Sequence, residues 1–175
     1  MHQDVLIATL TKKMVDYSKG NLHDVSHLLK VHAFARTLGI LEKLSERELL
    51  ILEIAALLHD IACPLCRAKY GGHAYGKDQE REGGPLAREF LESCSLPELD
   101  AELIGRVVFL VSHHHTLENV TGRDYQLLME ADYLVNAAEH PYSTAQIGNM
   151  REKLFKSATG KALLDSLYLE KHVKL

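Results

Sequence analysis

The sequence predicts an all-α protein, a single-domain helical bundle of about six to eight helices. Apolar residues recur at helical spacing along most of the 175 residues, and no stretch alternates for long enough to make a strand. The chain has no internal repeat, low-complexity tract or linker between two cores. A chain of this length can bury roughly 70% of the surface that its unfolded form exposes, so one domain over residues 1–175 is expected.

The N-terminal part predicts two helices. Apolar positions within residues 5–17 share one helical face, and this first helix should end near Gly20. The second helix should begin at about Asn21 or Asp24. Gly39 is expected to stop it, because glycine commonly follows the last residue of a helix.

A third helix is predicted by the segment SERE at residues 45–48, which has the pattern of a capping box. Residues 49–58 then read LLILEIAALL. A helix that is apolar around nearly its whole circumference is expected in the centre of a bundle.

Residues 61–76 are predicted to form a long loop, because they contain one proline and three glycines. Pro85 and Pro97 are predicted in the first turns of the next two helices, which should end near Cys94 and Ser112.

The C-terminal part predicts two or three further helices. Thr121-Gly122 should close a second loop, and residues 125–139 have a clear helical pattern. Pro141 should interrupt that helix, because proline lacks a backbone donor. One or two helices are expected after it.

Charge and apolarity argue against several functional classes. The net charge of −4 provides no broad basic surface, so nucleic-acid binding is not expected. The N-terminal residues lack a basic leader region, and the most apolar window, residues 49–58, is too short to cross a bilayer. Three cysteines without an export signal indicate a reducing compartment. We therefore expect a cytoplasmic protein without a membrane partner.

Residues 57–66, LLHDIACPLC, contain two candidate metal-binding pairs, His59-Asp60 and Cys63-x-x-Cys66. A structural zinc site commonly has four ligands, and the third cysteine, Cys94, stands alone. A thioredoxin-type redox pair usually occurs near a βαβ pattern, and no strand is predicted before Cys63. We interpret both cysteines of the pair as small packing residues, with redox or metal chemistry as the alternative.

The pair His59-Asp60 follows an apolar helix and should lie at its buried C-terminal end. A cation is favoured there by the helix dipole, and an unpaired carboxylate is costly. His27 falls on the inward face of the second helix, and Asp132 falls on the inward side of residues 125–139. One shared divalent cation explains side chains from three helices economically, although a buried hydrogen bond would explain His27 or Asp132 alone.

The order His27, His59-Asp60, Asp132 resembles the H…HD…D signature of the HD superfamily of metal-dependent phosphohydrolases. The local sequences HDVSHLLKVHAFARTLG, AALLHDIA and YQLLMEADYLVN are also similar to that family, over about residues 20–140. The resemblance implies an all-α bundle with a divalent metal ion (Mn, Mg, Co, Ni, Zn or Fe). Its implied ligands are His27, His59, Asp60 and Asp132.

Some members of the superfamily hold a second metal ion with additional histidines. At the first such position, in QEREGGPLAREFL, this sequence has Glu80, and a carboxylate can still bind a cation. The next element resembles VSHHHT. There His113 and His114 are favoured over His115, because neighbouring helical residues point about 100° apart. Three exposed histidines are the alternative.

The other histidines are expected to have ordinary roles. His23 precedes His27 by four residues, on the same helical face, and a capping or solvated role is favoured for it. Surface or loop positions are also expected for His32, His73, His140 and His172.

The resemblance implies hydrolysis of a phosphomonoester or phosphoanhydride, with a nucleotide as the expected substrate. Asp60 would orient the attacking water, and His113 or His114 would protonate the leaving group if it is not a ligand. The glycines of residues 61–76 would let that loop close as a lid. Candidates for binding the phosphate, each of which is equally explained as a solvated surface charge, are Lys69, Lys77 and Arg123.

Two other classes of function stay open. A minority of the superfamily are mixed-valent di-iron oxygenases, and Glu80 in place of a histidine argues against that class. A non-catalytic binding module, in which metal only holds the helices together, is the other. The expected partner is a small-molecule phosphate ester, with a homodimer as the expected assembly.

Overall fold

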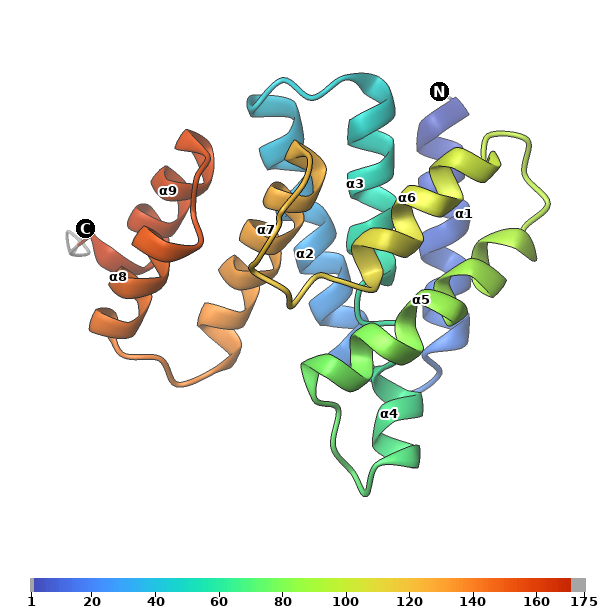
Figure 1. The fold of residues 1–175 in the computed structure, drawn as a ribbon, viewed down its shortest axis with the longest axis horizontal. Coiled ribbons are helices and arrows are strands. Elements are labelled where there is room, and N and C mark those ends of the chain that lie inside the picture. Colours follow the sequence, from blue (N-terminus) through green and yellow to red (C-terminus); the bar gives the residue numbers. More distant parts are fainter. Residues whose placement is uncertain (1, 171–175) are drawn as a thin grey trace.

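The computed structural model describes residues 2–170, which are mostly helical, with no strand among them (Figure 1). The predicted fold class is therefore confirmed. The elements in chain order are α1 (His2–Tyr17), α2 (Leu22–Leu41), α3 (Glu46–Leu58), α4 (Cys63–Lys69), α5 (Gly76–Glu92), α6 (Ala101–Val111), α7 (Arg123–Glu139), α8 (Thr144–Lys153), α9 (Ala158–Leu164) and the π-helical turn η1 (Asp165–Leu169).

Helix α3 lies in the centre of the bundle, as its apolar circumference predicted. It packs against α1, α2, α6 and α7 (Figure 1). Its N-terminus has the predicted capping box, with Ser45 and Glu48 bonding each other's backbone. The segment Glu46–Lys69 has the length and apolarity of a membrane-spanning helix, but 78% of its most apolar window is buried inside the structure. Burial in the core accounts for its composition.

Helix α2 continues past Gly39 to Leu41, so the predicted stop at Gly39 is wrong. A Cβ atom at Gly39 would lie 2.6 Å from Leu49 Cδ1. The glycine is needed for the close approach of α2 and α3, and not for ending the helix.

The predicted loop at residues 61–76 contains α4, so it is shorter than expected. Pro64 fits in the first turn of α4, where no backbone donor is required. The first-turn prediction for Pro85 is wrong, because Pro85 lies inside α5. Pro85 and Arg81 are both exposed, so solvent can hydrogen-bond the Arg81 carbonyl that loses its helical partner. The first-turn prediction for Pro97 is also wrong, because α6 begins only at Ala101, behind the N-cap Asp100.

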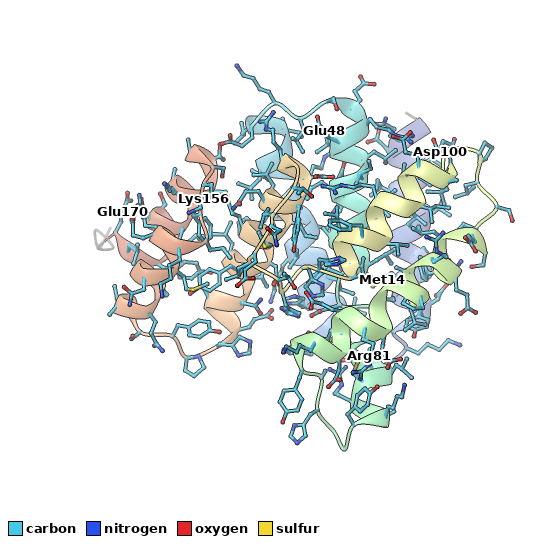
Figure 2. The ribbon with its side chains drawn as sticks, viewed as in Figure 1. Met14, Glu48, Arg81, Asp100, Lys156 and Glu170 are labelled. Atoms are coloured by element: carbon cyan, nitrogen blue, oxygen red, sulfur yellow. The ribbon has the colours of Figure 1, made fainter. Side chains whose placement is uncertain are left out.

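The C-terminal helices lie beside α7, on the side of the molecule away from α1 (Figure 1). Glu130 of α7 is fully buried and accepts hydrogen bonds from the backbone N–H groups of Lys156 (2.7 Å) and Ser157 (3.0 Å). Lys156 lies next to α7 in Figure 2, at the start of the α9 segment. This carboxylate therefore holds the chain that carries α8 and α9 against the bundle.

Candidate metal centre

A cleft of about 820 Å³ opens between the bundle and the C-terminal helices. Side chains from α2, α4, α5 and α7 line it, together with residues after α3 and α6. A cleft of this volume suits a small-molecule ligand. The residues predicted to bind metal gather at one part of its wall.

The first group consists of His27 on α2, His59 at the C-cap of α3, Asp60 directly after it and Asp132 on α7. The Nε2 atoms of His27 and His59 lie 3.2 Å apart, and they lie 3.2 and 3.4 Å, respectively, from Asp132 Oδ1. Asp60 Oδ2 is 3.8 Å from each of the two nitrogens. Ligands at the usual 2.0–2.2 Å from one ion are roughly 3 to 3.5 Å apart. His27, His59 and Asp60 form a group able to hold a cation, and Asp132 lies at ligand spacing from both imidazoles.

Hydrogen bonds orient the imidazoles. Nδ1 of His27 donates to Glu139 Oε2 (2.8 Å), Nδ1 of His59 to the Ala56 carbonyl (3.0 Å), and Nδ1 of His114 to the Val111 carbonyl (2.8 Å). A neutral imidazole that donates from Nδ1 presents a lone pair on Nε2, which is the tautomer that binds metal. Helix ends supply two of these acceptors, because their last carbonyls have no partner within the helix.

A second group contains Asp60, His114 and His115. Asp60 Oδ1 lies 3.3 Å from His114 Nε2, and both atoms are buried without a hydrogen bond among the side chains and backbone of residues 2–170. Buried polar atoms rarely stay unpaired, because desolvation is costly. A cation between them would satisfy both, so the donor set fits a metal ion here.

Charges within the cluster balance each other. Burial opposes ionisation of Asp60, but His59 and His114 lower the pKa of its carboxyl group. The pKa of Asp132 is likewise lowered by His27 and His59 against the effect of burial. Burial lowers the pKa of His27, but Asp132, Asp60 and Glu139 outweigh it and raise that pKa to about 9. The two carboxylates therefore attract positive charge to this point.

The structure brings His115 to the cluster in place of His113, so the predicted preference for His113 over His115 is wrong. The His113 ring stacks on Phe109 at 4.3 Å between centroids, and its Nδ1 donates to the Phe109 carbonyl (2.7 Å). The tract begins where α6 ends, and the turn aims the second and third rings at the cleft.

The structure also places Glu80 outside both groups. Glu80 Oε1 accepts hydrogen bonds from the His115 backbone N–H and from Thr116 Oγ1, both at 3.0 Å. It therefore anchors the turn that carries His115. Gln79, one residue earlier, faces the cleft instead: His115 Nε2 donates to its carbonyl oxygen, and its amide donates to Cys63 Sγ (2.9 Å).

The predicted phosphate-binding residues separate into two sets. Lys77 lines the cleft and makes no ion pair within the described part of the chain. Lys69 lies outside the cleft, where its ammonium is 2.9 Å from Glu82, and Arg123 donates to the Glu42 carbonyl at the end of α2. Arg67, which the sequence did not suggest, lines the cleft and is fixed by Asp24.

The two cysteines of α4 are buried, and burial raises the pKa of both thiols. Neither is therefore an activated thiolate, which agrees with a packing role. Neither belongs to a group of potential metal ligands in the described region.

Most of the remaining histidines lie where the sequence placed them. His23 and His140 are exposed at the rim of the cleft, and the exposed His73 stacks on Tyr75. The surface prediction is wrong for His32, which is largely buried with Nε2 3.0 Å from Glu53. His172 lies outside the described residues.

The sequence did not point to Glu139, Gln79 or Arg67, and it ranked His115 below its two neighbours. A signal existed for Glu139, because it lies two helical turns after Asp132 and so shares its face of α7. No periodicity could reveal Gln79, since its role depends on where α4 and α5 meet.

The arrangement defines a class of protein, an all-α bundle with imidazoles and carboxylates able to hold a divalent metal. The HD domain family matches residues 24–137, more than half of the chain, so the chain belongs to this family. It is similar in structure to a predicted HD superfamily hydrolase from an uncultured Thermotogales bacterium, with 23% sequence identity and a TM-score of 0.67. That match covers 92% of this chain and 84% of the other, and it shows the shared fold. No curated protein matches the sequence.

Proposed function

We propose that the protein is a metal-dependent phosphohydrolase that cleaves a phosphomonoester or phosphoanhydride, with a nucleotide as the expected substrate. The observation that carries the proposal is Asp60, whose two oxygens face the two groups of ligands. One of these oxygens lies 3.3 Å from His114 Nε2, and both atoms are buried without a hydrogen bond among the described residues. Membership of the HD domain family supports the same chemistry.

In this proposal His27, His59, Asp60 and Asp132 would hold one ion, and Asp60, His114 and His115 are the residues that would hold a second. A divalent ion supplies Lewis-acid chemistry: it acidifies water toward neutral pKa and offsets negative charge on a phosphoryl oxygen. Glu139 keeps the His27 ring in place, and Asn136 donates to Asp132 Oδ1 (2.9 Å), so the ligands are oriented in advance.

The cleft also contains groups suited to the phosphate. Arg67 and Lys77 line its wall, and guanidinium and ammonium groups bind phosphate oxygens. Asp24 holds the Arg67 guanidinium, which reduces the conformational freedom lost on binding. His113 points away from the cleft, so the proposal gives it no role in protonating the leaving group.

The test is to measure bound metal by elemental analysis and then phosphate release with Mn, Mg, Co, Ni and Fe. Substrates are p-nitrophenyl phosphate, bis-p-nitrophenyl phosphate and a nucleotide panel. We expect metal-stimulated release that disappears in Asp60→Ala and Asp132→Ala variants of unchanged helical content. Asp124→Asn is the matched control, because Asp124 is a buried carboxylate of α7 that pairs with Arg106 outside the cleft.

Phosphate release that survives both ligand substitutions would contradict the proposal. Bound iron with oxygen consumption and no phosphate release would favour the di-iron oxygenase instead. Stable metal binding without either activity would favour the binding module. The cytoplasmic location, the small-molecule partner and the homodimer stay predictions.

A further inference from the structure

A second hollow of about 280 Å³ adjoins the main cleft, between the C-terminal end of α7 and α8. Tyr133, Tyr142 and Met150 line both hollows, so the two spaces are adjacent. The remaining lining residues are Gln146 and Asn149. One liquid water molecule occupies roughly 30 Å³, so this hollow has room for a chemical group larger than several water molecules.

Tyr133 links the hollow to the metal centre, because it lines both the hollow and the main cleft that contains Asp132. Its side chain is 92% buried, and its hydroxyl group makes no hydrogen bond with any described residue. The ring packs edge-on against Phe155 at 5.8 Å and lies nearly parallel to Tyr142 at 6.0 Å between centroids. A rigidly held phenol with an unpaired hydroxyl is a polar group in need of a partner.

The residues that line the hollow favour a flat, uncharged ligand with hydrogen-bonding groups along its edge. No charged side chain lines the small hollow, whereas Arg67 and Lys77 line the main cleft. Aromatic faces and the Met150 thioether suit stacking on a π-system, and carboxamides such as Asn149 suit the donors and acceptors of a base edge. A hydrocarbon chain would leave the Tyr133 hydroxyl without a hydrogen bond. A sugar without a base has no π-system to stack on the tyrosine rings.

We propose that this hollow, formed by Tyr133, Tyr142, Gln146, Asn149 and Met150, binds the nucleobase of a nucleoside phosphate whose phosphate reaches the metal centre. The proposal deepens the proposed function and rests on it for the reaction. The base occupies the space between α7 and α8, and Tyr133 hydrogen-bonds its edge. The C-terminal helices thereby determine which phosphate esters are accepted.

The first experiment measures binding of adenosine, guanosine, cytidine and uridine by calorimetry, which requires no turnover. We expect at least one nucleoside to bind the wild type and Asp60→Ala alike. Tyr133→Phe should weaken that binding about fivefold to tenfold, the usual effect of losing one hydrogen bond. Tyr168→Phe is the matched control, because its hydroxyl bonds the Leu134 carbonyl outside the hollow. Asn149→Ala is a second variant at an exposed position, where folding is not at risk.

The second experiment compares kcat/KM for nucleoside 5′-monophosphates with kcat/KM for ribose 5-phosphate, which has no base. We expect the wild type to prefer a nucleotide at least tenfold, and Tyr133→Phe or Asn149→Ala to lower this ratio. Equal use of ribose 5-phosphate, or nucleoside binding that is unaffected by both variants, would overturn the base site.

The two proposals fail separately. Nucleoside binding that depends on Tyr133, without phosphate release from any substrate, would support the base site and contradict the phosphohydrolase. Phosphate release that depends on Asp60, without nucleoside binding or base preference, would do the reverse.

Discussion

Helices α2 and α3 each contribute to two buried clusters of histidine and carboxylate, and these clusters differ in how their charges are paired. At the metal centre, His27 and His59 face Asp60 and Asp132. At the other cluster, Glu53 of α3 is 4% exposed and accepts hydrogen bonds from His32 (3.0 Å) and, with both oxygens, from Arg36 (2.8 and 2.9 Å).

The difference is a guanidinium group. Arg36 neutralises Glu53 and satisfies both of its oxygens, so nothing more can bind there. No arginine or lysine forms an ion pair with Asp60 or Asp132 within the described residues, and Asp60 Oδ1 faces the His114 ring without a hydrogen bond. Similar side chains therefore make a closed structural ion pair at one cluster and a group able to hold a cation at the other.

The largest effect is expected from a substitution that disrupts the metal centre. Asp132→Asn should lower phosphohydrolase activity about 1,000-fold, because losing a ligand removes several kcal/mol of transition-state stabilisation. It should also abolish the stabilisation of the fold by added metal, which is about 2.7 kcal/mol at a metal concentration of 100 times Kd. In the wild type this stabilisation raises the melting temperature. Thermal melts with and without Mn²⁺ measure this. A variant that keeps the metal-dependent shift would contradict the ligand assignment.

The opposite result is expected at the structural pair. Glu53→Gln should reduce the free energy of unfolding by about 2 to 3 kcal/mol, less than for a fully buried pair because Arg36 is 45% exposed. The metal-dependent rise in melting temperature should remain. Urea unfolding gives the stability, and a lost metal response would show that the two clusters are not independent.

The same pair predicts a pH dependence. Burial opposes ionisation of Glu53, but His32 and Arg36 lower its pKa below the ordinary 4.5. A carboxyl group with a lowered folded-state pKa stabilises the fold above its unfolded pKa, and the contribution is lost as pH falls. The wild type should therefore lose more stability than Glu53→Gln on acidification from pH 5. Parallel stability curves for the two proteins would contradict this.

A smaller effect is expected at Glu139, which orients the candidate ligand His27. Glu139→Gln keeps an oxygen beside His27 Nδ1 but removes the charge, and should weaken metal binding about 10- to 100-fold. Competition with a metal chelator measures the affinity. Lys30→Gln is a useful control, because Lys30 contacts the other Glu139 oxygen at 2.9 Å and is itself exposed.

The smallest effect is expected at His113, and it is compared with the effect of substituting the adjacent His114. His113→Ala should change activity by less than about threefold, because its ring stacks on Phe109 away from the cleft. His114→Ala removes a ring whose Nε2 faces Asp60 and should reduce activity far more. Steady-state kinetics on both variants, at matched helical content, decides the order. A larger loss for His113 would reverse the assignment that the structure makes.

By itself the sequence determined the helical fold class, the central place of α3 and the inward positions of His27, His59, Asp60 and Asp132. These features depend on hydrophobic periodicity and on the high cost of burying unpaired charge, both of which act locally along the chain.

Only the tertiary structure decided which neighbours complete the site. Gly39 ends no helix because α3 approaches it closely, and His115 enters the cluster because a turn after α6 redirects the tract. Arg67 reaches the cleft while Lys69 does not, although both lie on α4. Such choices depend on contacts between distant segments, and no local pattern encodes them.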